Sequence, residues 1–214
     1  MRTPLFTTGN NFPSPEFTVG GGRPVYYEIG KELPGGFNID LSAFPKGSVV
    51  QTGSPISVDE ATRTAKLHIA VSVFEAAIAT ATEIKVKKLL GGVTISAGQF
   101  VIKAPATTTG TATSVTVSSI DSSNSEYDVL TLSAAIGVLA VGDILVEADV
   151  LGAGAKIKVV PSALTRYDIY ADPTSTTFTC GAVIEGIVYE RRIPPVASAI
   201  KALFLNEITF SQSR

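Results

Sequence analysis

Few residues in this sequence could carry out chemistry: there is one histidine, His68, and one cysteine, Cys180. A zinc site needs three or four ligands, so these two residues would have to recruit carboxylates. A serine hydrolase would need His68 as its base, and the sequence has no Gly-x-Ser-x-Gly motif. We therefore interpret His68 as an exposed or half-buried strand residue and Cys180 as a packed free thiol.

Two groups of carboxylates are the remaining candidates for calcium binding or acid–base catalysis. The first contains Asp121, Glu126 and Asp128, and the second contains Asp143, Glu147 and Asp149. Neither has the Asp-x-Asp-x-Asp-Gly spacing of a calcium loop, and strand alternation separates their side chains. Hydrolysis by a carboxylate pair such as Asp143 and Glu147 is the one route left to an enzyme. We predict no catalytic, cofactor-binding or metal-binding residue, and no enzyme.

The composition indicates a surface that contacts other protein. The chain has 214 residues, a formal net charge of −2, 17% charged and 45% hydrophobic residues, and a mean hydropathy of +0.32. So few charges on a chain rich in small aliphatic residues leave little to keep a monomer soluble. The charge balance gives no indication of nucleic-acid binding. We also expect no membrane-spanning helix and no standard secretion signal, because no apolar stretch has the necessary length.

Short runs rich in Val, Ile and Thr recur through the middle of the chain and predict β-strands. The runs are 83–88, 100–103, 114–120, 129–132, 144–146 and 156–160, and Gly, Asp, Asn and Ser lie between them. An earlier strand is predicted where Leu67, Ile69, Val71 and Val73 alternate with smaller or polar residues. Strands at this spacing indicate a mainly β fold, either a compact barrel or a sandwich.

An internal match strengthens this prediction. The segment 97–104 (AGQFVIKA) matches 141–148 (VGDILVEA) at a constant offset of 44 residues. The match places Gly98 opposite Gly142, and glycine admits the positive φ that a turn requires. We therefore predict an internal duplication, in which two strand-turn-strand units fold over into one barrel and share its core.

Residues 1–55 combine many prolines with regularly spaced aromatic residues. Prolines at this density break helices and central strands, so we expect an extended arm with a short strand at 24–29. The alternative is an irregular lead-in that packs on its own domain. An arm needs apolar anchors on its partner, and we predict that these are Phe6, Phe12, Phe17, Tyr26, Tyr27 and Phe37.

The last part of the chain, 161–214, is predicted to form a small β module with one short helix. It contains a strand at 181–192 with a bulge at Gly186, helical spacing over 196–204 and a closing strand at 208–210. Arg191 and Arg192 stand beside Glu190 and predict a surface ion-pair group; as a second choice they contact an acidic partner. The predicted domains are thus 1–55, 56–160 (the barrel) and 161–214.

Several of these segments resemble parts of known protein families. The stretch from about Ala65 to Ala148, with EIKVKK, ISAGQFVIKA and AVGDILVEA, resembles head fibre proteins of tailed bacteriophages, especially phages of gut Bacteroidales, including the crAss-like group. The closing part, CGAVIEGIVYERRIPP and VASAIKALFLNEITF, is similar to the end of capsid decoration proteins. The resemblance implies a homo-oligomer, often a trimer, that attaches to the outside of a capsid and has no catalytic residues.

Our first hypothesis is therefore a structural virion protein on the capsid surface, assembled in the cytoplasm of the host bacterium. Its expected partners are further copies of the chain, with a trimer favoured over a dimer, the major capsid protein and other head proteins. The alternative is a β-barrel carbohydrate-binding or adhesion module that contacts host surface glycans. That alternative needs exposed aromatic platforms, yet Trp is absent and the six Tyr are scattered.

Overall fold

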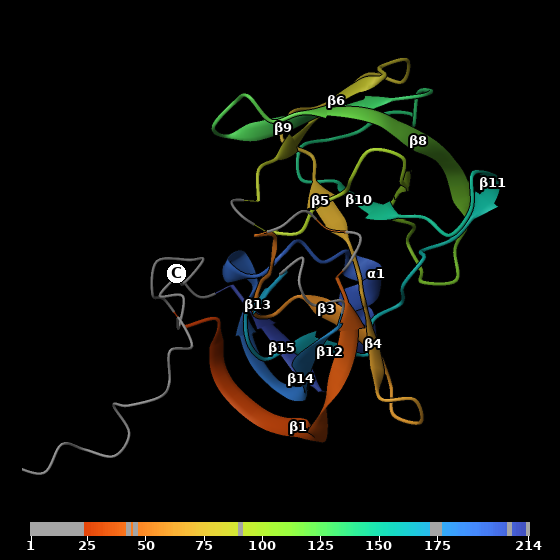
Figure 1. Cartoon of the computed structure of the whole chain (residues 1–214). Coiled ribbons are helices and arrows are strands. Elements are labelled where there is room, and N and C mark those ends of the chain that lie inside the picture. Colours follow the sequence, from red (N-terminus) through yellow and green to blue (C-terminus); the bar gives the residue numbers. More distant parts are fainter. Residues whose placement is uncertain are drawn as a thin grey trace, which may run out of the picture.

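The computed structural model describes residues 24–41, 44, 47–89, 92–171, 177–204 and 207–212. These residues form two β modules, which lie one above the other in Figure 1. We call the upper one the barrel and the lower one the terminal module, because strands from both ends of the chain build it. The predicted fold class, mainly β with curled sheets and one short helix near the C-terminus, is confirmed.

The terminal module is built on a six-stranded sheet with the order β1-β4-β3-β12-β14-β15. Its strands are β1 (Tyr26–Asp40), β3 (Pro55–Asp59), β4 (Thr64–Leu67), β12 (Ala163–Thr165), β14 (Thr177–Tyr189) and β15 (Ile208–Ser211). Because β1 pairs with both β4 and β14, the path from β1 through β4, β3 and β12 to β14 closes on itself. Two short strands, β2 (Val49–Val50) and β13 (Ile169–Tyr170), form a separate pair.

The barrel is a seven-stranded sheet with the order β5-β10-β7-β8-β9-β6, and β11 pairs with β8 off this path. Its strands are β5 (Ala70–Ser72), β6 (Glu83–Lys87), β7 (Phe100–Lys103), β8 (Ala112–Asp121), β9 (Tyr127–Leu132), β10 (Ile144–Glu147) and β11 (Gly152–Ala155). A bridge between Val73 and Val86 joins the two ends of the path, and Phe74 N donates to Lys85 O at 2.9 Å. The sheet therefore curls around an enclosed core.

The predicted duplication appears in the register of the barrel. Strand β6 pairs antiparallel with β9, the strand 44 residues later, and Lys85 lies opposite Val129. In the same way β7 pairs with β10, and Ile102 lies opposite Val146. The β5–β10 pairing, with Val71 opposite Leu145, has its equivalent in the β8–β7 pairing, with Val115 opposite Val101. The two units are thus related by a pseudo-two-fold axis that runs between β6 and β9 and between β7 and β10.

Hydrogen bonds in the connections repeat with the same offset. Gly98 N donates to Val117 O at 2.8 Å, and Gly142 N donates to Val73 O at 2.9 Å. Both glycines have a left-handed φ, +88° and +86°. The side chain of Gln99 accepts from Ser96 N, as that of Asp143 accepts from Ala140 N. The duplication therefore extends from the strands to the turns that connect them.

The interior contains three hydrophobic cores, and one of them joins the two modules. One fills the barrel, one fills the terminal module, and the third lies between them and takes residues from both. Val101 and Leu145 face the barrel core, whereas their neighbours Ile102 and Val146 face the shared core. Strands β7 and β10 are thus buried on both faces, which explains their continuous apolar runs.

A short helical segment covers the shared core from the side of the terminal module. It follows the 3-10 turn η1 (Glu190–Arg192) and consists of α1 (Ser198–Lys201) and the 3-10 turn η2 (Ala202–Phe204). Ile200 and Phe204 are almost fully buried there. The helix predicted over 196–204 is therefore present, shortened to this stretch.

The structure corrects the predicted arm and the predicted domain boundaries. Residues 26–40, assigned above to an extended arm, form β1, which pairs with β14 of the same chain. Pro34 fits because the register slips between Leu33 and Phe37, so the ladder needs no N–H from it. The boundaries at 55 and 160 do not separate the modules, since β3 and β4 belong to the terminal module.

Two local predictions also change. The strand predicted at 156–160 is wrong: Gly152–Ala155 pair with the long strand β8 instead, and Ile157 makes a single bridge to Ala148. The bulge predicted at Gly186 lies opposite it in β1, where the register shifts between Ile29 and Lys31. Glycine is required at 186 because a Cβ there would lie 2.5 Å from the carbonyl oxygen of Glu28.

Candidate functional site

Tyrosine and arginine side chains gather where β1 begins and β14 ends. Tyr27 is 68% exposed, and its ring meets that of Tyr189 edge-on at a centroid distance of 6.2 Å. The guanidinium of Arg192 lies 4.2 Å from the centroid of the Tyr189 ring. We call Tyr27, Tyr189, Arg191 and Arg192 the tyrosine–arginine surface. Edge-on ring packing and cation–π contact hold its rings in fixed orientations.

The backbone explains this arrangement. Tyr189 N donates to Val25 O at 2.9 Å, which ties the start of β1 to the end of β14. The side chain of Arg192 donates to Pro24 O at 2.6 Å, so its guanidinium is held over the ring by a second bond. Arg191 is exposed. Tyr27 and Arg192, predicted as contact residues, are therefore brought together through Tyr189, and Arg191 adjoins them in sequence.

The other predicted contact residues lie elsewhere. Tyr26 points inward, where its hydroxyl donates to Thr165 O at 2.7 Å and burial raises the pKa of the phenol. Phe37 is fully buried under the guanidinium of Arg63, which lies 4.4 Å from its ring centroid. Phe37 is therefore not on the surface, and Tyr26 is half-buried with its hydroxyl group inside the module. Phe6, Phe12 and Phe17 lie outside the described residues.

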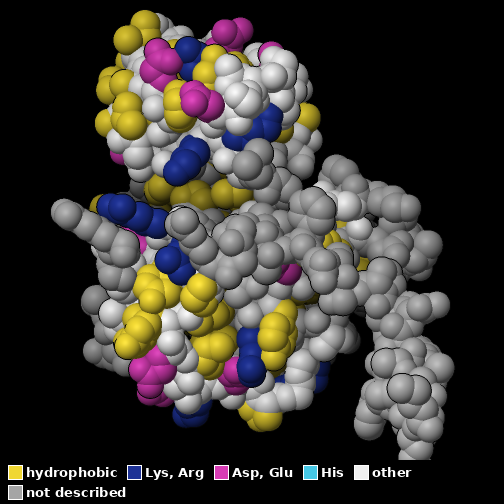
Figure 2. Space-filling model, turned by 90° about the vertical axis from the view of Figure 1, so that its left-hand side faces the viewer, with side chains coloured by type: hydrophobic (Ala, Val, Ile, Leu, Met, Phe, Trp, Pro, Cys, Tyr) yellow, Lys and Arg dark blue, Asp and Glu magenta, His cyan; other side chains and the backbone are white. Residues whose placement is uncertain are grey.

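A second tyrosine–arginine pair lies between β12 and β13. Tyr167 is 58% exposed, and the guanidinium of Arg166 lies 4.8 Å from its ring centroid. Arg166 also forms an ion pair with Glu32 of β1. The sequence analysis missed this pair, although an aromatic residue directly after an arginine in a short connection could have indicated it. Figure 2 shows hydrophobic side chains with Lys and Arg around them on one face of both modules.

The ion pair predicted between Glu190 and its arginine neighbours takes another form. Glu190 pairs with Lys201 of α1 and accepts from Gln212 at 3.1 Å. The two bonds lower the pKa of this carboxyl group against the effect of its partial burial. Glu190 therefore fastens the short helix to the end of β14, and Arg192 contacts Pro24 O and the Tyr189 ring instead.

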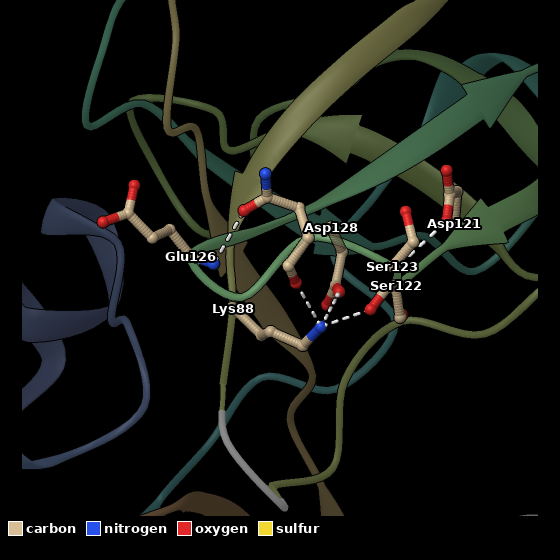
Figure 3. A network of polar contacts seen from close by, with 7 residues as sticks. Lys88, Asp121, Ser122, Ser123, Glu126 and Asp128 are labelled. Atoms are coloured by element: carbon tan, nitrogen blue, oxygen red, sulfur yellow. Dashed lines mark hydrogen bonds and ion pairs between the residues drawn. The ribbon is translucent and has the colours of Figure 1, made fainter.

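In the first acidic group only Asp128 contacts an ammonium group, that of Lys88 (Figure 3). Lys88 Nζ donates to the carbonyl oxygens of Ser122 and Asn124, each at 2.6 Å, and lies 3.3 Å from Asp128 Oδ1. Two carbonyls and a carboxylate around one point would suit a metal cation, and here the lysine supplies the positive charge. Asp121 instead accepts from Ser123 N at 2.9 Å, which closes the turn and lowers its pKa.

The second acidic group is spread along the barrel. Asp143 pairs with Lys103 at 2.6 Å, and this contact, together with the bond from Ala140 N, lowers its pKa. Glu147 pairs with Lys158 at 2.6 Å. Each carboxylate thus has its own cationic partner, and nothing places Asp143 and Glu147 as an acid–base pair. Within the described ranges, no three His, Cys, Asp or Glu side chains gather as metal ligands would.

His68 corrects the prediction of an exposed or half-buried residue. It connects β4 to β5 at the junction of the modules and is 4% exposed. Its Nδ1 lies 2.7 Å from Val159 O, so Nδ1 carries the proton, and Nε2 has no hydrogen-bond partner. The ring borders a small cavity lined by Gln51, Ser54, Leu67, Ala70, Leu89, Val93 and Pro194. Burial lowers its pKa, so the imidazole is neutral at pH 7.

Cys180 is a packed thiol, as predicted. It is 2% exposed in the core of the terminal module, opposite Phe37 in the β1–β14 ladder. Burial raises its pKa to about 11, so the thiol form dominates at neutral pH. This is the reverse of what a nucleophilic or metal-binding cysteine requires.

The described surface is therefore suited to binding. Exposed, oriented Tyr and Arg side chains can stack on apolar groups and donate to carboxylates or carbonyls. In the part of the chain that the structure describes, no helix has the length and apolar character needed to cross a membrane. Comparison of the chain with protein-family models, with curated proteins and with solved structures found no match in any of the three.

Proposed function

We propose that this protein is a structural virion protein: a homo-oligomeric head fibre or decoration protein on the outer surface of a phage capsid. The tyrosine–arginine surface binds the major capsid protein. The observation that carries the proposal is the cluster of Tyr27, which is exposed, with Tyr189 and Arg192, which are half-buried and held in fixed orientations. Tyr and Arg dominate the energetically important positions of protein interfaces. The phage context comes from the sequence resemblance described above.

The electrostatics of the site support a protein partner. Arg191 and Arg192 follow each other at the end of β14, and Glu190, the nearest acidic residue in sequence, is paired with Lys201. The two arginines therefore give this surface a local positive charge that favours an acidic patch on the partner. A rim of charge around exposed rings is the usual arrangement of a contact surface.

The test is co-sedimentation of the purified protein with capsids that lack it. Tyr27→Ala combined with Arg191→Ala should weaken binding at least about tenfold, because both side chains belong to the proposed contact centre. Both are exposed, so the fold should be unaffected. Tyr167→Ala is the matched control, since it removes an equally exposed tyrosine elsewhere. Equal binding of the double variant and the wild-type protein would disprove the role of this surface.

A deletion tests the remaining part of the predicted arm. Removal of residues 1–45 would also remove β1 and unfold the terminal module, so the deletion should end at residue 23. Pro24 must stay, because its carbonyl oxygen holds Arg192. If Phe6, Phe12 and Phe17 contact the capsid, the shortened protein binds it more weakly; unchanged binding excludes them from that contact.

Glycan binding is the second candidate, and the exposed rings of Tyr27 and Tyr167 favour it. Tyrosine faces can stack on the apolar faces of sugars. In this case, the protein is a carbohydrate-binding or adhesion module that contacts host surface glycans. A glycan array would show several related hits that disappear in Tyr27→Ala or Tyr167→Ala. An array without hits leaves the capsid role as the better proposal.

A further inference from the structure

Two loops of the barrel present an apolar surface with the Lys103–Asp143 ion pair at its edge, where Lys103 Nζ donates to Val138 O at 3.3 Å. Mutual hydrogen bonds between Ala77 and Leu139, at 2.9 and 3.0 Å, hold the loops side by side. Around this bridge Ile78 is 72% exposed, Val138 66% and Val141 67%. The segments 76–82 and 133–142 contain no charged residue. We call these two segments the loop surface. Such a surface in contact with water is unfavourable and marks an interaction site.

The terminal module covers the loop that the pseudo-two-fold axis relates to segment 133–142. Segment 133–142 corresponds to 89–98 in the first unit, and there the terminal module lies against the loop. Val93 N donates to Val49 O at 3.0 Å, and Gly92 forms a bridge with Val49. Phe44 packs on the barrel core and on the core of the terminal module. Phe44 and Val49, which follow β1, thus cover one unit, whereas Val138 and Val141 on the equivalent loop of the other unit are exposed.

A further segment with spaced aromatic residues lies near the N-terminus. Residues 1–23 contain the apolar side chains Leu5, Phe6, Phe12, Phe17 and Val19, and their charged residues are Arg2, Glu16 and Arg23. Prolines at 4, 13 and 15 disfavour a helix through this segment and bias the residues before them toward extended backbone. Fully extended, 23 residues span up to about 76 Å, which is enough to reach a neighbouring subunit.

We propose that the loop surface binds residues 1–23 of a neighbouring copy, so that exchange of these segments joins the subunits of the oligomer. This inference rests on the proposed homo-oligomer and names the contact that holds it together. The aromatic side chains bury against Ile78, Val138 and Val141 as Phe44 does against the first unit. Because the two segments contain no charged residue and the Lys103 ammonium at their edge is paired with Asp143, apolar contact provides most of the binding free energy, and salt has a small effect on it.

The first experiment measures the mass of the full chain by light scattering at micromolar concentration. The wild-type protein should be an oligomer. Ile78→Glu with Val138→Glu, and separately Phe6→Ser with Phe12→Ser and Phe17→Ser, should each give a monomer. Leu151→Glu is the matched control: Leu151 is 57% exposed, lies outside the loop surface and should leave the oligomer intact. A wild-type monomer overturns the inference, and so do arm variants that remain oligomeric.

The second experiment identifies which copy supplies the segment. Full chains with Phe12→Cys are mixed with tagged full chains with Val138→Cys and oxidised; Cys180 is buried and does not compete. A disulfide-linked pair of tagged and untagged chains supports the exchange. A bond that forms only when one chain carries both cysteines shows docking within a chain and overturns it. Capsid co-sedimentation is measured in parallel: a wild-type monomer that binds capsids contradicts this inference alone, and a wild-type oligomer that does not bind them contradicts the capsid role.

Discussion

The two units of the barrel share a backbone but differ in what they place under the loops that precede β6 and β9. In one unit Lys88 and Asp128 form a buried ion pair, and the lysine also binds two carbonyls of the loop at 121–126. The positions related by the pseudo-two-fold axis are Leu132 and Ile84, both buried and apolar. Lys88 N donates to Glu126 O just as Leu132 N donates to Thr82 O. One backbone site thus accepts either a charged pair or an apolar pair.

This difference accounts for the character of the loops. The loop above the ion pair is polar, because its carbonyls turn inward to the ammonium group of Lys88. The equivalent loop, 76–82, has an apolar pair beneath it and no ammonium to bind, and its side chains are Ala, Ile and Thr. The second loop is therefore free to present apolar side chains outward, and it forms part of the loop surface.

The largest expected effect comes from breaking the ion pair. Lys88→Leu leaves Asp128 buried without a cation and leaves two carbonyls unpaired, so the free energy of unfolding should fall by about 3 kcal/mol. Lys88→Leu with Asp128→Ile copies the apolar pair of the other unit and should recover all but about 1 kcal/mol. Urea denaturation at pH 7 measures both. If the double variant is no more stable than the single one, the two sites are not interchangeable.

A second, smaller effect tests the symmetry itself. Gly98 and Gly142 have nearly the same left-handed φ, and no atom would clash with a Cβ at either position. Gly98→Ala and Gly142→Ala should therefore each cost about 1 to 2 kcal/mol through backbone strain alone. Thermal or urea unfolding should give equal losses within error. A much larger loss at one glycine would show that the environments of the two turns differ in a way that the shared register hides.

The duplication could be predicted from sequence, because the glycine turns and the apolar runs recur at one fixed offset. The closed path of the terminal module could not, because it depends on pairing Tyr26–Asp40 with Thr177–Tyr189, far apart in the chain. The prolines and glycines near the N-terminus argue against a strand locally, and long-range pairing overrides them. The contact surface was predicted in part: Tyr27 and Arg191 are exposed and Arg192 is half-buried, whereas Phe37 is fully buried and Tyr26 is half-buried with its hydroxyl bonded inside the module.

The burial of His68 could not be predicted from the local sequence pattern either. Its neighbours in sequence alternate as a half-buried strand would, but the residue connects two strands of different modules. The cavity beside it is lined by Leu89 and Val93 from the first barrel unit and by Gln51, Ser54 and Pro194 from the terminal module. Only docking of these elements decides that the ring is enclosed. The position related to His68 by the offset is Ala112, so the second unit has no equivalent ring.

The smallest expected effect concerns His68, which lies beside the barrel unit that the terminal module covers. Burial lowers the pKa of His68 in the folded protein, whereas in the unfolded chain the ring titrates near its ordinary pKa of about 6.5. Below about pH 6.5 the unfolded state therefore binds the proton more readily than the folded state, and stability decreases as the pH falls toward the folded pKa. The stabilising effect of the neutral ring is fully present above that range.

His68→Gln should remove this pH dependence, because glutamine does not titrate and its amide can still donate to Val159 O. Urea unfolding of both proteins between pH 7.5 and pH 5.5 gives the comparison, since Asp and Glu titrate mostly below this range and contribute equally to both. The difference in stability between wild type and variant should shrink or change sign toward pH 5.5. A difference that stays constant would mean that the ring takes up a proton as easily in the junction as in water, and that the covered unit is less tightly closed than the bond to Val159 implies.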